Sequence, residues 1–278
     1  MVSRRLQLIL GNILLIVVIA ACALSPASTQ SVSTSAPAGN TALPAQPEST
    51  PTIPAPTQPA PASAAGGCAN AYFPVSSGNS WSYASSGNNL GAYTYTWTVA
   101  SVSDTGFSTR DQYSTGVNAV IKWKCHDGNL AALDAGSNSL ILTTSKVKVT
   151  STSIAAEGYN VPTSFETGKT WSEKLTIGSE ITSGTRVVNS QIVEQFNCSA
   201  AGADSVTVPA GTFNAVKTTC AETMIVSALM QGTAVPAGTT VNVSITDWYA
   251  KGVGLVKSVR TGSTSGTETI VLTQYDVK

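Results

Sequence analysis

Large apolar side chains alternate with small polar side chains along much of the chain beyond residue 68. In residues 93–99 the order is Tyr-Thr-Tyr-Thr-Trp-Thr-Val. A period of two places the large side chains on one face of an extended segment, which is typical of a half-buried antiparallel strand. The same alternation predicts further strands at residues 81–83, 117–124, 139–152, 185–196, 205–208, 213–226, 240–249, 254–260 and 267–275.

Clusters of glycine, asparagine, aspartate and serine separate these segments and predict turns. They include residues 126–129, 201–204 and 262–266. Residues 221–230 are the one stretch in which a short helix would fit. About ten strands at hairpin spacing, without a long amphipathic helix, predict an all-β fold. We expect an antiparallel meander that forms a strongly curved sheet or barrel.

Two short patterns occur twice. Gly78-x-x-Trp81-Ser is repeated as Gly168-x-x-Trp171-Ser, and the Val-Pro-Ala-Gly-Thr of residues 208–212 is repeated at residues 235–239. Duplication of a half-sheet would explain both repeats, and so would the use of one kind of turn before one kind of strand. We favour the repeated turn, because the spacings between the elements differ.

The N-terminal segment has a different pattern. Arg4 and Arg5 precede an apolar run that ends in Ile-Ala-Ala-Cys at residues 19–22. Basic, apolar and then small residues are the order of an export signal. The last four residues resemble the lipobox of bacterial lipoproteins, which implies cleavage before Cys22 and a lipid anchor on its sulfur. Two or three acyl chains, at about 0.8 kcal/mol per buried methylene, hold a protein far more firmly than one.

Two alternatives to the lipobox stay open. The apolar run over residues 6–24 is nearly long enough for an uncleaved membrane anchor, and an ordinary signal peptide would be cut at an Ala-x-Ala-like site. Gly11 and Asn12 interrupt the run and no basic cluster follows it, which favours the lipoprotein signal. We expect a signal peptide over residues 1–21 and acylation of Cys22, for example by palmitate. In every case the remaining domain lies outside the cytoplasm.

Residues 22–67 are expected to form the lipid attachment site and a disordered linker. Nine of the thirteen prolines lie in residues 25–67, and this stretch contains no aromatic residue. Such a segment buries too little apolar surface to offset its ordering entropy. At about 3.1 Å per residue where extended, it would hold residues 68–278 on the order of 100 Å from the membrane.

Charge narrows the class of partner. The fifteen basic residues include Arg4 and Arg5, which leave with the signal, so thirteen basic and fifteen acidic residues remain. A slightly acidic chain does not attract polyanions, and no nucleic-acid partner is expected. The abundant serine, threonine, glycine, alanine and valine suit an exported β-rich domain.

Three sequence blocks carry a resemblance to a family. The blocks are Tyr-Phe-Pro at residues 72–74 with Gly-x-x-Trp-x-Tyr at 78–83, VPAGTFNAVK at 208–217 and WYAKGVGLVK at 248–257. Together they resemble an uncharacterised family of bacterial envelope lipoproteins. The resemblance covers most of residues 68–278 and implies an extracytoplasmic β-rich fold without an established activity. It supplies no catalytic residues. The three blocks are explained by structural roles, and the alternative is a binding surface that contains Trp248 and Tyr249.

Four cysteines remain when Cys22 is assigned to the lipid: Cys68, Cys125, Cys198 and Cys220. An even number in an exported chain predicts two disulfides, for which three connectivities are available. We expect Cys68 to pair with Cys125, and Cys198 with Cys220, whose loop brackets the turn at residue 209. A C-x-x-C motif is absent and the chain has one histidine, so neither a metal site nor another cofactor is expected.

Two motifs invite a catalytic interpretation. His126 follows Cys125, but neighbouring residues of a strand point to opposite faces, so we expect a histidine in a turn. Ser145-x-x-Lys148 matches the Ser-x-x-Lys of penicillin-recognising enzymes, but that chemistry needs one helical turn, and this segment alternates as a strand.

A carboxylate pair is the remaining catalytic candidate. Glu194, Glu222 and Asp247 would suit glycoside hydrolysis if two of them met in space. Carboxylates scattered over strands are usually solvated, however, and we expect the protein not to be an enzyme.

The first functional hypothesis is therefore a lipid-anchored, non-enzymatic binding or structural module of the envelope. Its partner would be an envelope protein, a glycan or an apolar ligand, besides the membrane that holds Cys22. The alternative is a carrier, in which a curved sheet encloses a lipid or other apolar molecule. An apolar cavity of about 300 Å³ or more would favour the carrier, and a filled interior would favour a binding or structural module.

Overall fold

The computed structural model describes residues 66–88, 91–133, 147–183, 185–230, 233–234, 238–262 and 266–278. The expected signal peptide, the expected lipidation site Cys22 and the linker up to residue 65 lie outside these ranges. Within them, no helical segment has the length and apolarity that crossing a membrane requires.

The described residues form one 3-10 turn, η1 (Gly66–Cys68), and a sheet of thirteen strands. The strands are β1 (Ser80–Asn88), β2 (Tyr93–Ser103), β3 (Gly106–Tyr113), β4 (Asn118–His126), β5 (Asn129–Ala132), β6 (Val147–Gly158), β7 (Thr170–Ser183), β8 (Arg186–Val208), β9 (Gly211–Met230), β10 (Thr233–Ala234), β11 (Thr239–Ala250), β12 (Gly254–Gly262) and β13 (Gly266–Asp276).

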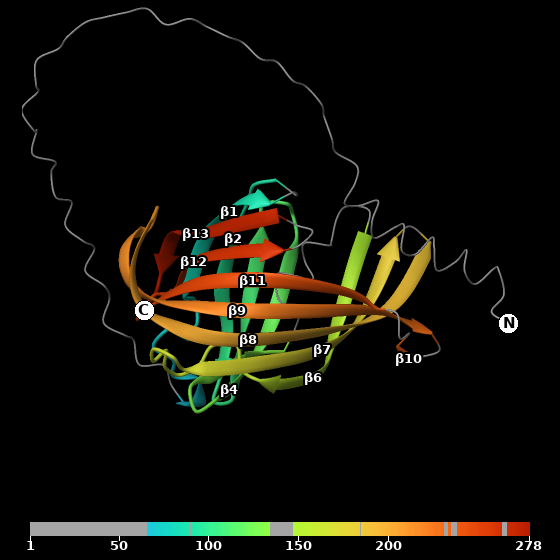
Figure 1. The fold of residues 1–278 in the computed structure, drawn as a ribbon, viewed down its shortest axis with the longest axis horizontal. Coiled ribbons are helices and arrows are strands. Elements are labelled where there is room, and N and C mark those ends of the chain that lie inside the picture. The colour runs from blue at the N-terminus through green and yellow to red at the C-terminus, as the bar shows by residue number, and fades with distance from the viewer. Residues whose placement is uncertain are drawn as a thin grey trace, which may run out of the picture. The chain divides into compact units, whose positions relative to one another are not determined.

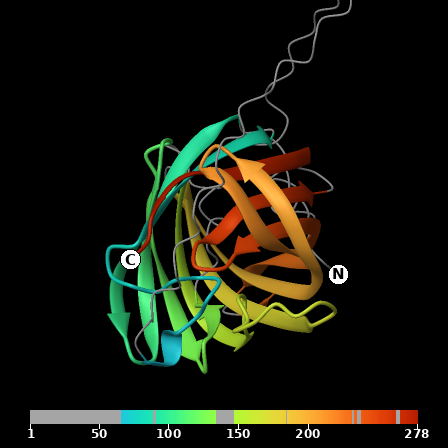
Figure 2. The same ribbon diagram turned by 90° about the vertical axis from the view of Figure 1, so that its left-hand side faces the viewer.

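The sheet is an antiparallel meander that curves round on itself. Its order is β5-β4-β3-β2-β1-β13-β12-β11-β9-β8-β7-β6, with the short β10 paired to β9 off this path. Neighbours in the sheet are therefore neighbours in the chain, except where β1 pairs with β13 and where β9 pairs with β11 past the short β10. Figure 1 shows the long strands β8, β9 and β11 side by side, and Figure 2 shows the strands arranged in a ring. The expected all-β meander is confirmed.

The two edges of the sheet meet just beyond β6. Leu130 of β5 forms an antiparallel bridge with Val161. The Leu130 amide donates to the Val161 carbonyl at 2.9 Å, and the Val161 amide donates to the Leu130 carbonyl at 3.0 Å. This bridge nearly closes the barrel and covers an edge that would otherwise be open to pairing with another chain.

The segment before β1 crosses one end of the barrel. The Asn70 side-chain amide donates to the carbonyls of Gly128 and Pro162 at 2.7 and 3.0 Å, which ties the segment to two separate turns. The ring of Phe73 lies 5.5 Å from that of Phe107 and 5.4 Å from that of Trp123. This aromatic contact places the main hydrophobic core at the covered end of the barrel.

One expected turn and the suggested helix are wrong. Residues 201–204 lie within β8, which continues through a β-bulge between Ala200 and Gly202 instead of ending. Residues 221–230 belong to β9. Residues 221–226 pair with β8 on one side and β11 on the other, and residues 229–230 pair with β10. Their β-branched residues suit a strand that has a partner on each edge.

The repeated Gly-x-x-Trp-Ser pattern forms the same turn at both sites. In each copy, three backbone hydrogen bonds of 2.8–3.0 Å form, one within the turn and two between the turn and a later strand. That strand is β2 for the first copy and β8 for the second. The bonds are Gly78 N to Val99 O, Val99 N to Asn79 O and Asn79 N to Ser76 O, and Gly168 N to Ala200 O, Ala200 N to Lys169 O and Lys169 N to Glu166 O. Both copies lead directly into a strand, β1 or β7. Most of the second copy of the other repeat lies outside the described residues.

Candidate functional site

The barrel contains a partly open cavity of about 130 Å³ whose lining mixes aromatic with ionisable side chains. The aromatic members are Trp97, Trp123, Tyr159, Trp171, Phe196 and Tyr249, and the ionisable members besides tyrosine are Asp111, Glu173, Glu194, Asp247 and Arg260. They come from strands all round the barrel, because alternate residues of each strand point inward.

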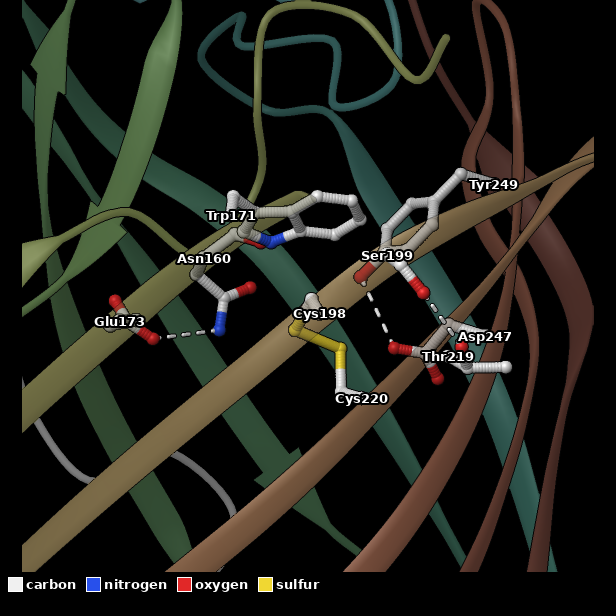
Figure 3. Close-up of a disulfide and its surroundings, with 9 residues drawn as sticks. All are labelled: Asn160, Trp171, Glu173, Cys198, Ser199, Thr219, Cys220, Asp247 and Tyr249. Atoms are coloured by element: carbon white, nitrogen blue, oxygen red, sulfur yellow. Dashed lines mark hydrogen bonds between the residues drawn. A yellow bond between two sulfur atoms is a disulfide. The ribbon is translucent and has the colours of Figure 1, made fainter. Parts of the chain in front are cut away.

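Asp111 of β3 and Glu173 of β7 are the most deeply buried acids in this lining, each 2% exposed. Asp111 Oδ1 and Glu173 Oε1 form no hydrogen bond of good geometry within the protein. The side chains of Thr109 and Trp97 lie near the Asp111 carboxyl, and the Ala132 backbone lies near that of Glu173, and these groups lower the pKa of the two acids against the larger effect of burial. The other oxygen of Glu173 accepts a hydrogen bond of 3.1 Å from the Asn160 amide (Figure 3). Burial raises the pKa of each carboxyl to about 7, because the charged form is poorly solvated inside the barrel.

Glu194 and Glu222 lie on neighbouring strands β8 and β9 and are 3% and 2% exposed. Burial raises the pKa of Glu194 to about 8, and the nearby charges of Glu222 and then Glu173 add to the effect. The expectation that these carboxylates are solvated is therefore wrong. Their strands alternate as expected, but the acids fall on the inward face.

Asp247 of β11 and Arg260 of β12 form the oppositely charged part of the lining. Burial raises the pKa of Asp247, while Arg260 lowers it. For Arg260, burial works against the charged form, but Asp247 and Glu222 outweigh burial and raise the guanidinium pKa further. The Tyr249 hydroxyl donates to Asp247 Oδ2 at 3.4 Å (Figure 3). Glu194, Glu222 and Asp247, which were candidates from the sequence, thus share one interior.

Thr218 of β9 adds an uncharged polar group. Its side chain is fully buried, and its hydroxyl has no hydrogen-bond partner within the protein although it lines the cavity. Trp97 Nε1 and Asp247 Oδ1, which belong to residues of the same lining, also form no hydrogen bond of good geometry. Buried polar side-chain atoms without partners are uncommon in folded proteins, so five of them around one cavity require an explanation.

The four remaining cysteines form two disulfides at different places in the barrel. Cys68 is joined to Cys125, with a Cα–Cα distance of 4.9 Å, and fixes the segment before β1 to β4. Cys198 and Cys220 face each other directly across β8 and β9, with a Cα–Cα distance of 4.0 Å. This second disulfide lines the cavity between Glu173 and Asp247 (Figure 3).

The catalytic motifs considered in the sequence lie elsewhere. The side chain of His126 is 84% exposed at the turn between β4 and β5, next to Asp127. Lys148 lies in β6, whereas Ser145 falls outside the described residues. Among the residues that the structure describes, no group of three or more His, Cys, Asp or Glu side chains is arranged to hold a metal ion.

Trp248 and Tyr249 do not form one surface. Tyr249 points into the cavity, whereas the indole of Trp248 lies on the outside, with the Lys257 ammonium 4.9 Å and the Lys217 ammonium 5.6 Å from its ring centre. The indole N–H donates to Asp204 Oδ2 at 2.8 Å. The Trp248 ring is thus already in contact with its own neighbours.

Asp111, Glu173 and Thr218 were missed in the sequence. The available signal is an acid in phase with inward-facing apolar residues, as in Phe107-x-Thr-x-Asp111 and Trp171-x-Glu173-x-Leu175. An acid at such a position points into the barrel together with its apolar neighbours.

A family model described as DUF3108-like matches residues 96–261, which is more than half of the chain. Two solved structures are similar. One is a candidate lipoprotein from Parabacteroides distasonis ATCC 8503, with 17% identity, a TM-score of 0.49 and coverage of 74% of this chain and 99% of that chain. The other is a candidate exported protein with a YmcC-like fold from Bacteroides fragilis NCTC 9343, with 13% identity, a TM-score of 0.45 and coverage of 73% and 98%. No curated protein matches the sequence.

Proposed function

The chain belongs to the DUF3108-like family, and we propose that it is a non-enzymatic binding module of the cell envelope. In this proposal, lipid on Cys22 anchors the protein, residues 25–67 act as the tether, and the barrel holds a small ligand outside the cytoplasm. The signal-like N-terminus and the composition of the tether support the location.

The observation that carries the binding role is the set of unpartnered polar atoms around the cavity. Asp111 Oδ1, Glu173 Oε1 and Thr218 Oγ1 are buried, line the same space and have no partner within the protein. A buried polar atom costs stability unless it forms a hydrogen bond. A ligand inside the barrel would supply the missing bonds.

The structure supports an apolar carrier less well. The cavity of about 130 Å³ is well below the volume of about 300 Å³ at which typical ligand pockets begin. Four carboxyl side chains and one guanidinium line it, and each would be desolvated by an acyl chain without gaining a partner.

Mass spectrometry of the full-length protein extracted from membranes tests the proposal. We expect an acylated Cys22 at the mature N-terminus, and a Cys22→Ser variant that leaves the membrane fraction. Native spectra of the same non-reduced preparation should show a small molecule bound in a fixed ratio, or should acquire one when the cell's small-molecule extract is added. An unmodified Cys22 would refute the anchor. A barrel that takes up nothing from the extract would refute the binding role.

A further inference from the structure

We propose that the barrel cavity binds a small organic cation, a primary ammonium group on a short aliphatic body. This inference rests on the proposed binding function and names the class of ligand. It follows from the balance of charge inside the barrel, the nature of the cavity walls and the polar atoms that lack partners.

The interior contains more acids than bases. Arg260 is the one basic side chain in the cavity lining, and its strongest favourable interactions are with Asp247 and Glu222. Arg260 also lowers the pKa of Glu194, but this is the smallest of the effects on that acid. Asp111 and Glu173 then remain, without a second basic side chain in the lining to balance them. A cationic ligand would stabilise their ionised forms, whereas an anion would be repelled.

Four of the five unpartnered atoms of the lining can accept a hydrogen bond and therefore suit a donor; the fifth, the Trp97 indole N–H, is itself a donor. Ionised Asp111 and Glu173 offer Oδ1 and Oε1 as acceptors only, and the Thr218 hydroxyl, on a different strand, also accepts. An ammonium group carries three donors and no acceptor, and its hydrogen bonds to carboxylates are among the stronger ones in proteins. Thr218 is independent of the acidic cluster, is fully buried and faces the same space.

The walls favour an organic cation over a bare metal ion. Three tryptophans, two tyrosines and a phenylalanine line the cavity, besides Ile121, Leu175, Ile245 and Leu255. Aromatic faces attract organic cations, and aliphatic side chains pack against an alkyl body. Hard metal ions instead prefer a shell of oxygen ligands and water. The volume of about 130 Å³ is close to that of a cavity of about 150 Å³ known to hold one benzene molecule, so the ligand is small.

Isothermal titration of the full-length mature protein in detergent, non-reduced and at pH 7, tests this class of ligand. The probes are n-butylammonium chloride, 1-butanol, sodium butyrate and calcium chloride, each with a blank titration into detergent alone. We expect n-butylammonium to bind in a one-to-one ratio and at least about tenfold more tightly than 1-butanol, because only the cation gains charge-assisted bonds and contact with aromatic faces. Butyrate and calcium should not bind.

Isosteric variants locate the site. Asp111→Asn and Glu173→Gln should each weaken n-butylammonium binding by about tenfold or more. Glu157→Gln is the matched control, because Glu157 lies exposed on β6 next to β7 and should leave the affinity unchanged. Unfolding curves of the three variants show whether each is folded.

Release of protons on binding gives a readout that needs no variant. The ionisable groups of the cavity lining are Asp111, Glu173, Glu194, Asp247, Arg260, Tyr159 and Tyr249, and Glu222, Glu268, Tyr83 and Tyr95 are also buried in the barrel. The pKa of Asp111, of Glu173 and of Glu194 lies at about 7 to 8. A bound cation favours the ionised carboxyls, so binding at pH 7 should release protons. The measured heat would then differ between buffers of different ionisation enthalpy.

Each outcome decides something definite. Equal binding of 1-butanol, binding of butyrate or calcium in place of the amine, or no binding of n-butylammonium would overturn the cation proposal. The binding function itself would survive if native spectra still showed a ligand from the cell extract. If n-butylammonium binds, titration with Nα-acetyl-lysine amide separates two sources of the ammonium group. An affinity comparable to that of n-butylammonium points to a lysine side chain of a partner. A much weaker affinity points to a free small amine.

Discussion

Asp111 is the interior acid whose effect on stability can be worked out most directly. Its side chain is 2% exposed, and burial raises its pKa from 3.8 to about 7. Between these two values the folded protein keeps a proton that the unfolded chain has released. The free energy of unfolding therefore falls as the pH rises from about 4 through 7. The difference in pKa corresponds to roughly 4 kcal/mol.

Replacing Asp111 with asparagine keeps the shape of the side chain and removes its titration. We expect wild type and Asp111→Asn to have similar stability near pH 4. Near pH 8 the variant should be more stable by roughly 4 kcal/mol, or about 10 °C in Tm for a domain of this size. Glu173, Glu194, Glu222, Asp247, Arg260, Glu268 and the interior tyrosines are present in both proteins, so their own titrations largely cancel in the difference.

Thermal unfolding of the full-length mature protein, followed by circular dichroism between pH 4 and pH 9, measures this difference. Glu157→Gln serves as the control because Glu157 is exposed, and its curve should follow that of wild type. If the Tm of wild type and the Tm of Asp111→Asn fell equally as the pH rises, Asp111 would not keep its proton in this pH range. The buried, desolvated carboxyl on which the argument depends would then be refuted.

Two further predictions concern covalent and backbone constraints. Replacing Cys198 and Cys220 together with alanine should lower the free energy of unfolding by about 3 kcal/mol, measured by urea titration, because their bond closes a loop with a sequence separation of 22; an unchanged midpoint would contradict this. Gly128→Ala should cost about 3 kcal/mol in the same assay, since the residue has φ +75° and an added methyl would collide with the Ala69 carbonyl. Gly116→Ala is its control, with φ +86° but open space around it, and should cost about 1 kcal/mol; equal losses would show that the contact with Ala69 has no effect.

Hydrophobic alternation predicted the meander because most strands have one apolar and one polar face. It missed β3 and β7, where the inward positions include Thr109, Asp111 and Glu173. A polar residue inside a barrel breaks the pattern that otherwise identifies a strand. Two of the strands that carry the candidate site were therefore missed, whereas β8, β9, β11 and β12, which carry the rest of its polar side chains, were predicted.

Local signals predicted turns less reliably than strands. The glycine-rich residues 201–204 resemble a turn, yet hydrogen bonds to β9 keep β8 continuous through the bulge at Gly202. At residues 127–128 the same kind of signal marks a true hairpin, in which Asp127 has φ 49° and Gly128 has φ 75°. The difference depends on strand pairing across the sheet, which composition does not reveal.

One end of the barrel stabilises the fold, whereas the polar groups of the cavity lower its stability. At the covered end, Phe73, Trp81 and Phe107 pack together, and the Trp81 indole N–H donates to the Val253 carbonyl at 2.6 Å. In the cavity, Asp111 and Glu173 are buried with one oxygen each unpartnered. Apolar residues of similar volume at these two positions would be at least as stable, because a buried acid without a counter-charge weakens the fold. A need for packing therefore explains the covered end, while the acids of the cavity are better explained by a ligand that restores their hydrogen bonds and balances their charge.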